Sequence, residues 1–155
     1  MKNIALTKGL IAVIDDDDYE RVSAFKWHAS FSRKEHVYAS SGKAGSMHRF
    51  ITSASKGTEV DHINHNTLDN RKSNLRICTR SENQMNARKR RGPQSSKYKG
   101  VYPYPLRTGV KWRVLVTLNT KIVFDCIYDT EEQAAIAYNS EAVKFFGKFA
   151  FLNKV

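Results

Sequence analysis

The hydrophobic pattern of this chain changes its period near residue 130, and this change constrains the fold of the C-terminal part more than any other feature. From residue 130 to 146, apolar side chains recur at steps of three and four, which is the period of an amphipathic helix. Thr130 and Gln133 have the spacing of a capping box at its start, and Gly147 is expected to end it. Three segments before this helix are expected to form strands: residues 98–102, 111–118 and 121–128.

The last two of these strands are separated only by Asn119 and Thr120, which predicts a two-residue hairpin turn. Alternation along the middle strand puts two sets of side chains on opposite faces: Trp112, Val114, Val116 and Leu118 on one, and Arg113, Leu115 and Thr117 on the other. We therefore expect a three-stranded antiparallel sheet packed on one helix, with its second face available to a ligand.

The first 58 residues are expected to form a small β-rich unit with strands at residues 4–6, 10–14 and 36–39. The spacing of four between Trp27 and Phe31 allows a turn of helix at residues 25–31. Residues 15–18 are four consecutive aspartates, which at the end of a strand indicate a solvated turn rather than a metal site.

Composition points to an anionic partner. The 155 residues include 26 Lys and Arg against 15 Asp and Glu, a net charge of +11, and the positive charge is spread along the chain. Because no run of about 18 apolar residues occurs and the N-terminal segment turns acidic, we expect a cytoplasmic protein that is neither exported nor membrane-bound. Cys78 and Cys126 form no disulfide pattern and are expected to be small buried side chains in a reducing compartment.

The segment from residue 59 to 88 holds side chains suited to phosphodiester hydrolysis, which needs a hard cation and a base for water. Asp61 and Asn83 offer oxygen atoms to a cation, and His62 can accept a proton near neutral pH. Adjacent strand residues point to opposite sides, so this site requires an irregular strand end. With Ser81 as the N-cap of a following helix, Asn83 would face Asp61 across a hairpin.

At these residues the chain resembles the HNH nucleases of the ββα-metal fold, in particular homing endonucleases of phage and intron type. The resemblance covers about residues 48–88 and implies that Asp61 and Asn83 bind a metal while His62 is the general base. It also implies that Asn74 ties the loop and orients the base. Because the third motif position is Asn83 rather than His, the expected ion is Mg²⁺ or Mn²⁺ and not Zn²⁺.

Other polar residues near the motif are open to two interpretations each. His65 stands where the resemblance implies Gly, and it is expected to be a loop side chain rather than a ligand. A zinc cluster of His62, His65 and Cys78 is not expected, because a fourth ligand is missing. Arg71 either pairs with Asp69 or reaches a phosphate. His48 contacts DNA or is structural. The expected phosphate or DNA contacts in this part are His48, Arg49, Arg71, Arg76, Arg80, Arg88, Lys89, Arg90 and Arg91.

The C-terminal segment, residues 97–155, resembles the DNA-binding domain of plant ethylene-response factors of the Apetala type. It carries the three strands and the helix in order, and the resemblance implies that the sheet lies in the major groove of DNA. Tyr102, Tyr104 and Leu115 depart from the plant pattern, so no plant target sequence is implied. The expected contact surface is Lys99, Tyr102, Tyr104, Arg107, Lys111, Arg113, Thr117 and Lys121.

Together these features predict an α+β protein with three parts: an HNH nuclease domain at residues 1–91, a linker at 92–96 and a DNA-binding domain at 97–155. The expected function is a metal-dependent endonuclease that cuts double-stranded DNA at a site selected by its C-terminal domain. One active site of this kind cuts one strand, so a monomer would nick, and a double-strand break would need a homodimer on DNA or two visits. The alternatives are a catalytically inactive DNA-binding regulator and a nuclease acting on RNA.

Overall fold

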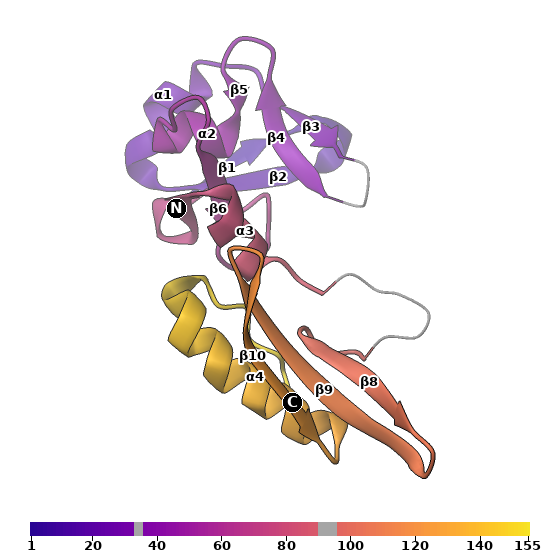
Figure 1. The fold of residues 1–155 in the computed structure, drawn as a ribbon. Helices are drawn as coiled ribbons and strands as arrows, with labels where there is room; N and C mark the ends of the chain where they lie inside the picture. The colour runs from indigo at the N-terminus through magenta and orange to yellow at the C-terminus, as the bar shows by residue number, and fades with distance from the viewer. Residues whose placement is uncertain (33–35, 90–95) are drawn as a thin grey trace. The chain divides into compact units, whose positions relative to one another are not determined.

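A computed structural model describes residues 1–32, 36–89 and 96–155 of the chain, and these form a mixed α+β structure (Figure 1). The chain divides into two compact units, Met1–Arg80 and Ser81–Val155, and each is described by itself. The expected linker begins beyond this division, and most of it falls outside the described residues. No described helix is long and apolar enough to cross a membrane.

The first unit contains three small antiparallel sheets and short helices. Its sheets pair β1 with β2, β3 with β4 and β5, and β6 with β7. The strands are β1 (Lys2–Ala5), β2 (Ile11–Ile14), β3 (His28–Phe31), β4 (Val37–Ser41), β5 (Gly45–Ser46), β6 (Glu59–His62) and β7 (Leu75–Cys78). The helices are α1 (Tyr19–Ser23) and α2 (Met47–Thr52), with 3₁₀ turns η1 (Thr7–Gly9), η2 (Asp16–Asp18) and η3 (Lys72–Asn74).

The structure differs from the sequence-based expectation at two places in this unit. Residues 28–31 form strand β3, not a turn of helix, because they pair in register with β4 along their whole length. Trp27, just before this strand, donates a hydrogen bond from its indole Nε1 to the carbonyl of Val22. Asp18 is buried rather than solvated, since its carboxylate binds Arg21 at 2.6 Å.

The core of the first unit lies between the β1–β2 hairpin and helix α2. Its fully buried side chains include Ile14, Val22 and Met47. Phe25, Trp27 and Phe50 pack edge to face beside them, with ring centroids 5.2–6.3 Å apart. This small core holds the elements from which the candidate site is built.

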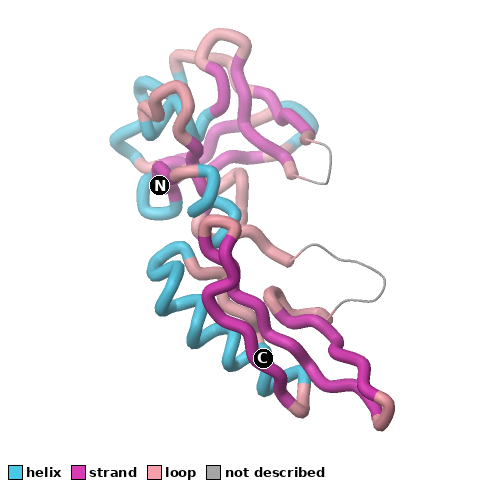
Figure 2. Tube along the Cα trace, viewed as in Figure 1, coloured by secondary structure: helices cyan, strands magenta, loops and turns pink. Residues whose placement is uncertain are grey.

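The second unit consists of helix α3, a three-stranded sheet and a long helix that covers the sheet (Figure 2). Helix α3 (Arg80–Asn86) begins one residue before the division between the units. The remaining elements are β8 (Val101–Leu106), β9 (Gly109–Leu118), β10 (Lys121–Tyr128), α4 (Glu131–Phe146) and the turn η4 (Gly147–Phe149). The strands are antiparallel in the order β10-β9-β8. Ser81 is the second residue of α3 and not its N-cap.

The predicted hairpin and helix of the second unit are confirmed. Asn119 and Thr120 both have positive φ angles, 48° and 67°, which is the conformation a two-residue turn of this kind requires. Thr130 caps α4 and forms both bonds of the capping box with Gln133. Val114 and Val116 are fully buried with Ala134 and other residues of α4, so the helix covers the expected face.

Besides Ser81, two expectations for this unit are wrong. The first strand begins at Val101 instead of residue 98, because Tyr98 turns into the core and Gly100 has a φ of +72° that breaks the extended backbone. Cys126 is exposed, whereas Cys78 is buried as expected.

Candidate nuclease site

The β6–β7 hairpin holds the central pair of the motif. Asp61 and His62 are the last two residues of β6, and each is only 6% exposed. Arg76 lies directly opposite Asp61 in the hairpin register, and its guanidinium binds Asp61 Oδ2 through Nε at 2.9 Å and Nη2 at 2.6 Å. The buried carboxylate is therefore accompanied by a cation.

The imidazole of His62 lies among three other side chains. Its Nε2 atom is 3.3 Å from Oδ1 of Asn70, and its ring centroid is 5.2 Å from that of His48 and 6.2 Å from that of Tyr38. Burial lowers the pKa of His62, while the Asn70 contact and the charge of Asp61 oppose this shift. The result favours the neutral ring, which is the form that can accept a proton.

His48 reaches this site from helix α2. Burial, followed by the nearby His62 and Arg49, lowers the pKa of His48 to about 4. Tyr38 lies beside it on β4, with ring centroids 5.5 Å apart, and burial raises the pKa of that phenol. His48 was expected to contact DNA or to be structural, and in the structure it lies beside the expected base.

The loop between β6 and β7 is held by its own polar side chains. Asn74 accepts a bond from the backbone N–H of Asn64 at 2.9 Å and donates to the carbonyl of Asp69 at 2.8 Å, so it ties the loop as expected. Asp69 binds Arg71 at 2.6 Å, which is the first of the two interpretations of that arginine. The Arg71 guanidinium, and secondarily Asn64, keeps the pKa of Asp69 below its usual value.

The N-terminal strands provide the support for this loop. Val13 on β2 accepts a hydrogen bond from the backbone of Asn70 at 2.8 Å and donates one to Leu68 at 2.8 Å. Thr67 donates from its hydroxyl to the carbonyl of Val37 on β4. Strands β2 and β4, which belong to the segment whose role the sequence left open, therefore form a scaffold under the motif loop.

Arg49 is occupied within the first unit. Its guanidinium donates to the carbonyls of Thr58 at 2.6 Å, Ala54 at 3.2 Å and Ser55 at 2.8 Å. It thereby closes the turn between α2 and β6, so this side chain has a structural role in addition to the DNA contact expected from the sequence. Arg80 is exposed at the start of α3.

Asn83, the second expected metal ligand, lies on α3 in the second unit. The end of that helix is held by Lys99, whose Nζ donates to the carbonyls of Gln84 at 3.2 Å, Met85 at 2.5 Å and Ala87 at 2.8 Å. A cation at this position satisfies the terminal carbonyls and complements the helix dipole. Burial lowers the pKa of Lys99 to about 8, which leaves it mainly protonated at neutral pH.

The remaining basic candidates before the sheet differ in their surroundings. Lys89 donates to the carbonyl of Val101 at 2.9 Å and lies over the Tyr102 ring, whereas Arg88 is exposed. Arg90 and Arg91 fall in the part of the chain that is not described.

The sheet face opposite α4 carries four of the other expected DNA contacts, Tyr102, Tyr104, Lys111 and Arg113. Tyr102 lies opposite Arg113 and Tyr104 opposite Lys111, and directly opposed residues share a face. Arg113 binds Asp125 at 2.5 Å and Lys111 binds Asp129 at 2.9 Å, so both cations have acidic neighbours. Arg107, Thr117 and Lys121 are exposed at the ends of the strands.

The donors expected for a metal are oxygen atoms, a carboxylate from Asp61 and an amide from Asn83, which fit a hard cation such as Mg²⁺ or Mn²⁺. One oxygen of Asp61 is shared with Arg76. Within the described residues, no three His, Cys, Asp or Glu side chains are grouped so that they could hold a metal.

A buried His beside a carboxylate at the end of a hairpin, with a loop tied by asparagines, is the arrangement of a nuclease motif. Residues 53–85 match the family model described as HNH endonuclease. The chain is 36% identical over 156 aligned positions to an uncharacterized HNH endonuclease of Acanthamoeba polyphaga mimivirus, covering 96% of this chain and 77% of the relative. No solved structure matches the chain significantly. The chain therefore belongs to the HNH endonuclease family, and it is a nuclease.

Three features of the site were not predicted from the sequence: the contact of Asn70 with His62, the ion pair of Arg76 with Asp61 and the position of Tyr38. The Asp69-Asn70-Arg71 run indicated only a pinned loop, and Arg76 was expected at a phosphate. Arg76 lies opposite Asp61 because of the register of the β6–β7 hairpin. The sequence would predict this register only if the ends of both strands were known.

Proposed function

We propose that this nuclease is a divalent-metal-dependent DNA endonuclease of the homing type, in which His62 is the general base and Asp61 and Asn83 hold the metal. The observation that carries the proposal is the buried His62, whose ring is kept neutral by its surroundings and stands next to the carboxylate of Asp61. Neutral imidazole is the side chain best suited to take a proton from water near neutral pH.

In the proposed reaction, His62 removes a proton from a water molecule that attacks the phosphorus in line with the 3′ oxygen. His62 then carries the proton as imidazolium, beside the charge of Asp61. A Mg²⁺ or Mn²⁺ ion, when bound, would supply stabilisation of the charge on the phosphate and on the departing oxygen. The tied loop and its scaffold keep His62 in position during this step.

We further propose that the second unit binds double-stranded DNA through the open face of its sheet. The face presents tyrosines and basic side chains together, a combination suited to stacking and to phosphate contact. Arg113 would exchange its ion pair with Asp125 for a DNA contact. The proposal includes cleavage by a monomer or by a homodimer on DNA. It also includes a cytoplasmic location of the protein.

The decisive experiment is plasmid cleavage with Mg²⁺ or Mn²⁺, comparing the wild type with His62→Ala. His28→Ala is the matched control, because His28 is an exposed histidine on β3 of the same unit. We expect metal-dependent nicking or linearisation by the wild type and the control, abolished by EDTA and reduced by about 10² or more in His62→Ala, which still binds DNA.

Cleavage by His62→Ala at the normal rate would show that His62 is not the base. Cleavage of structured RNA with none of double-stranded DNA would replace the substrate assignment. Binding of DNA without cutting, for every metal and substrate tried, would favour a regulatory role.

A further inference from the structure

The open face of the sheet in the second unit, which is the face that α4 does not cover, carries aliphatic side chains beside its cations (Figure 1). Val114 and Val116 of β9 point toward α4 and are fully buried. Leu115 lies between them in the strand and therefore points to the open face. On β10, Ile127 lies opposite Arg113, so it shares this face, and it is 42% exposed.

Ile122 reaches the same face through an irregularity in β10. It pairs with Thr117, whereas Phe124 pairs with Val116, so β10 has one extra residue, Val123, at this point. Val123 and Phe124 both pack against the core on the α4 side. In a regular strand Ile122 would share a face with Phe124, but the extra residue turns it to the open face, where it is 58% exposed.

Leu115, Ile122 and Ile127 form one aliphatic patch. Leu115 lies opposite Asp125, two residues from Ile127, and Ile122 lies opposite Thr117, two residues from Leu115. Such diagonal neighbours are about 7–8 Å apart, within reach of long side chains. None of the three belongs to a core cluster formed by the described residues. An exposed aliphatic patch that the core does not use indicates a binding surface.

The surroundings of the patch favour DNA as its partner. Arg113 lies beside Ile127, Lys121 precedes Ile122 and is exposed, and the whole chain has a net charge of +11. The major groove of DNA admits a two-stranded β-ribbon such as β9 and β10. The apolar group that base pairs present in this groove is the C5 methyl of thymine, which aliphatic side chains can contact.

The cation on this face is less available than the patch. Arg113 donates from Nε to Asp125 Oδ1 at 2.8 Å and from Nη2 to Oδ2 at 2.5 Å, so both ends of its planar fork are occupied. A bidentate contact to guanine requires this pair to break, whereas contact of the aliphatic side chains with methyl groups requires no exchange.

We propose, on the basis of the DNA binding proposed above, that the aliphatic patch determines the specificity of the second unit by contacting thymine methyl groups in the major groove. The preferred target is therefore rich in thymine at the positions that face Leu115, Ile122 and Ile127.

The test selects binding sites for the full chain from a pool of random-sequence DNA duplexes, in EDTA so that metal-dependent cleavage does not occur. The selected duplex is then made with thymine or with uracil, which differs only by lacking the C5 methyl. We expect thymine at the enriched positions and about fourfold weaker binding for each contacted methyl that uracil lacks.

Ile127→Ser removes one side chain of the patch at an exposed position, and thermal melting verifies that the variant is folded. We expect it to lose the preference for thymine over uracil at one position, and Ile122→Ser to lose it at another. Altered DNA stiffness or a less stable protein would not act at single positions, so this double comparison isolates the contact. Ile136→Ser is the matched control, because Ile136 is 59% exposed on α4 and should leave every preference intact.

Selected duplexes without enriched thymine, or equal affinity for the thymine and uracil duplexes, would overturn this inference and leave the proposed DNA binding in place. Self-association of the full chain that Ile127→Ser abolishes, with an unchanged preference for thymine, would assign the patch to a second copy of the chain instead. Absence of any binding to double-stranded DNA would refute the proposed DNA binding itself and this inference with it.

Discussion

Arg76 lies opposite Asp61 in the β6–β7 hairpin, and its Nη2 atom binds the Asp61 carboxylate at 2.6 Å in a site where both side chains are largely buried. The pair brings a cation to the acidic residue that is also the proposed metal ligand. A divalent ion bound there would share Asp61 with Arg76.

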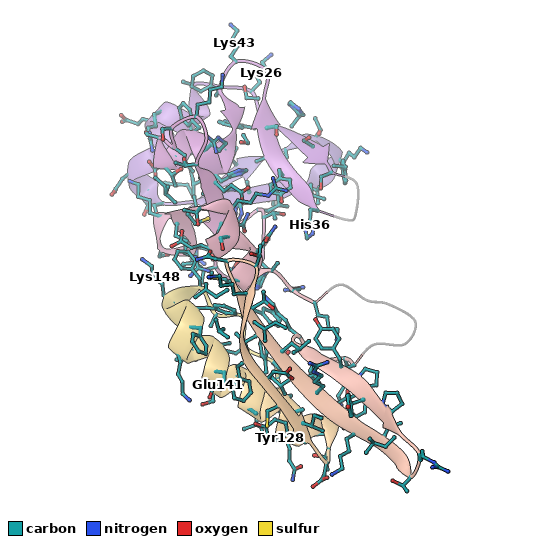
Figure 3. All side chains as sticks on the ribbon, in the orientation of Figure 1. Lys26, His36, Lys43, Tyr128, Glu141 and Lys148 are labelled. Carbon is teal, nitrogen blue, oxygen red and sulfur yellow. The ribbon has the colours of Figure 1, made fainter. Side chains whose placement is uncertain are left out.

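Replacing Arg76 should destabilise the first unit. In Arg76→Leu the carboxylate of Asp61 loses its counter-ion while buried, which we expect to lower the free energy of unfolding by about 3 kcal/mol. Urea denaturation followed by tryptophan fluorescence measures this through Trp27, which is buried in that unit. Lys144→Met breaks the surface pair of Lys144 with Glu141 on α4 and should change stability by less than about 1 kcal/mol. Figure 3 labels Glu141. An unchanged urea midpoint for Arg76→Leu would refute the prediction.

Metal binding should stabilise the wild type. An ion that binds only the folded chain adds about 2.7 kcal/mol at a hundredfold excess over its Kd, so Mn²⁺ should raise the melting temperature and EDTA should reverse the effect. Asp61→Asn and Asn83→Ala should lose this response. A full response to Mn²⁺ in both variants would place the ion at other residues.

The stability of the first unit should decrease below pH 6.5. The pKa of His48 is lowered from 6.5 to about 4 by burial in the folded chain, so the unfolded chain binds the proton first. Its contribution is complete above pH 6.5 and is lost as the pH falls toward 4, by roughly 2 kcal/mol.

His48→Asn should reduce this dependence, although the lowered pKa of His62 acts in the same direction and leaves part of it. Urea denaturation at a series of pH values measures the effect, with His36→Asn as the exposed control. Equal pH dependence of His48→Asn and the wild type would contradict the assignment.

Lys99 should matter for folding more than for DNA contact. Lys99→Met leaves the carbonyls at the end of α3 without their cation and should lower the stability of the second unit by about 1–2 kcal/mol. Lys97→Met, at an exposed pair with Glu132, should have little effect. Denaturation and DNA affinity are measured side by side. If Lys99→Met binds DNA more weakly at unchanged stability, Lys99 contacts DNA instead, and this prediction is wrong.

Gly100 should not tolerate a side chain. It has a φ of +72°, and an added Cβ would overlap the ring of Tyr138 on α4. Gly100→Ala should therefore destabilise the second unit by about 3 kcal/mol or more. Gly42→Ala, where a Cβ meets no atom within 4 Å, is the control. Similar melting temperatures for the two variants would show that Tyr138 moves aside without cost.

The sequence by itself determined the elements whose signals are local. The capping box of α4, the turn at Asn119 and Thr120 and the alternation of β9 all depend on neighbours within a few residues, and all are confirmed. The nuclease motif was recognisable for a similar reason, because it consists of particular residue types at short spacings in the sequence. Asp61, His62, Asn74 and Asn83 could be named without knowing the fold.

Only the tertiary structure decided which distant residues meet. Strand β3 exists because β4 pairs with it, against a local spacing that allowed a helix. Likewise Asn70 reaches His62, and Arg76 reaches Asp61, through a loop conformation and a strand register that local preferences do not specify. Such contacts depend on packing between segments far apart in the chain, and periodicity carries no information about that packing.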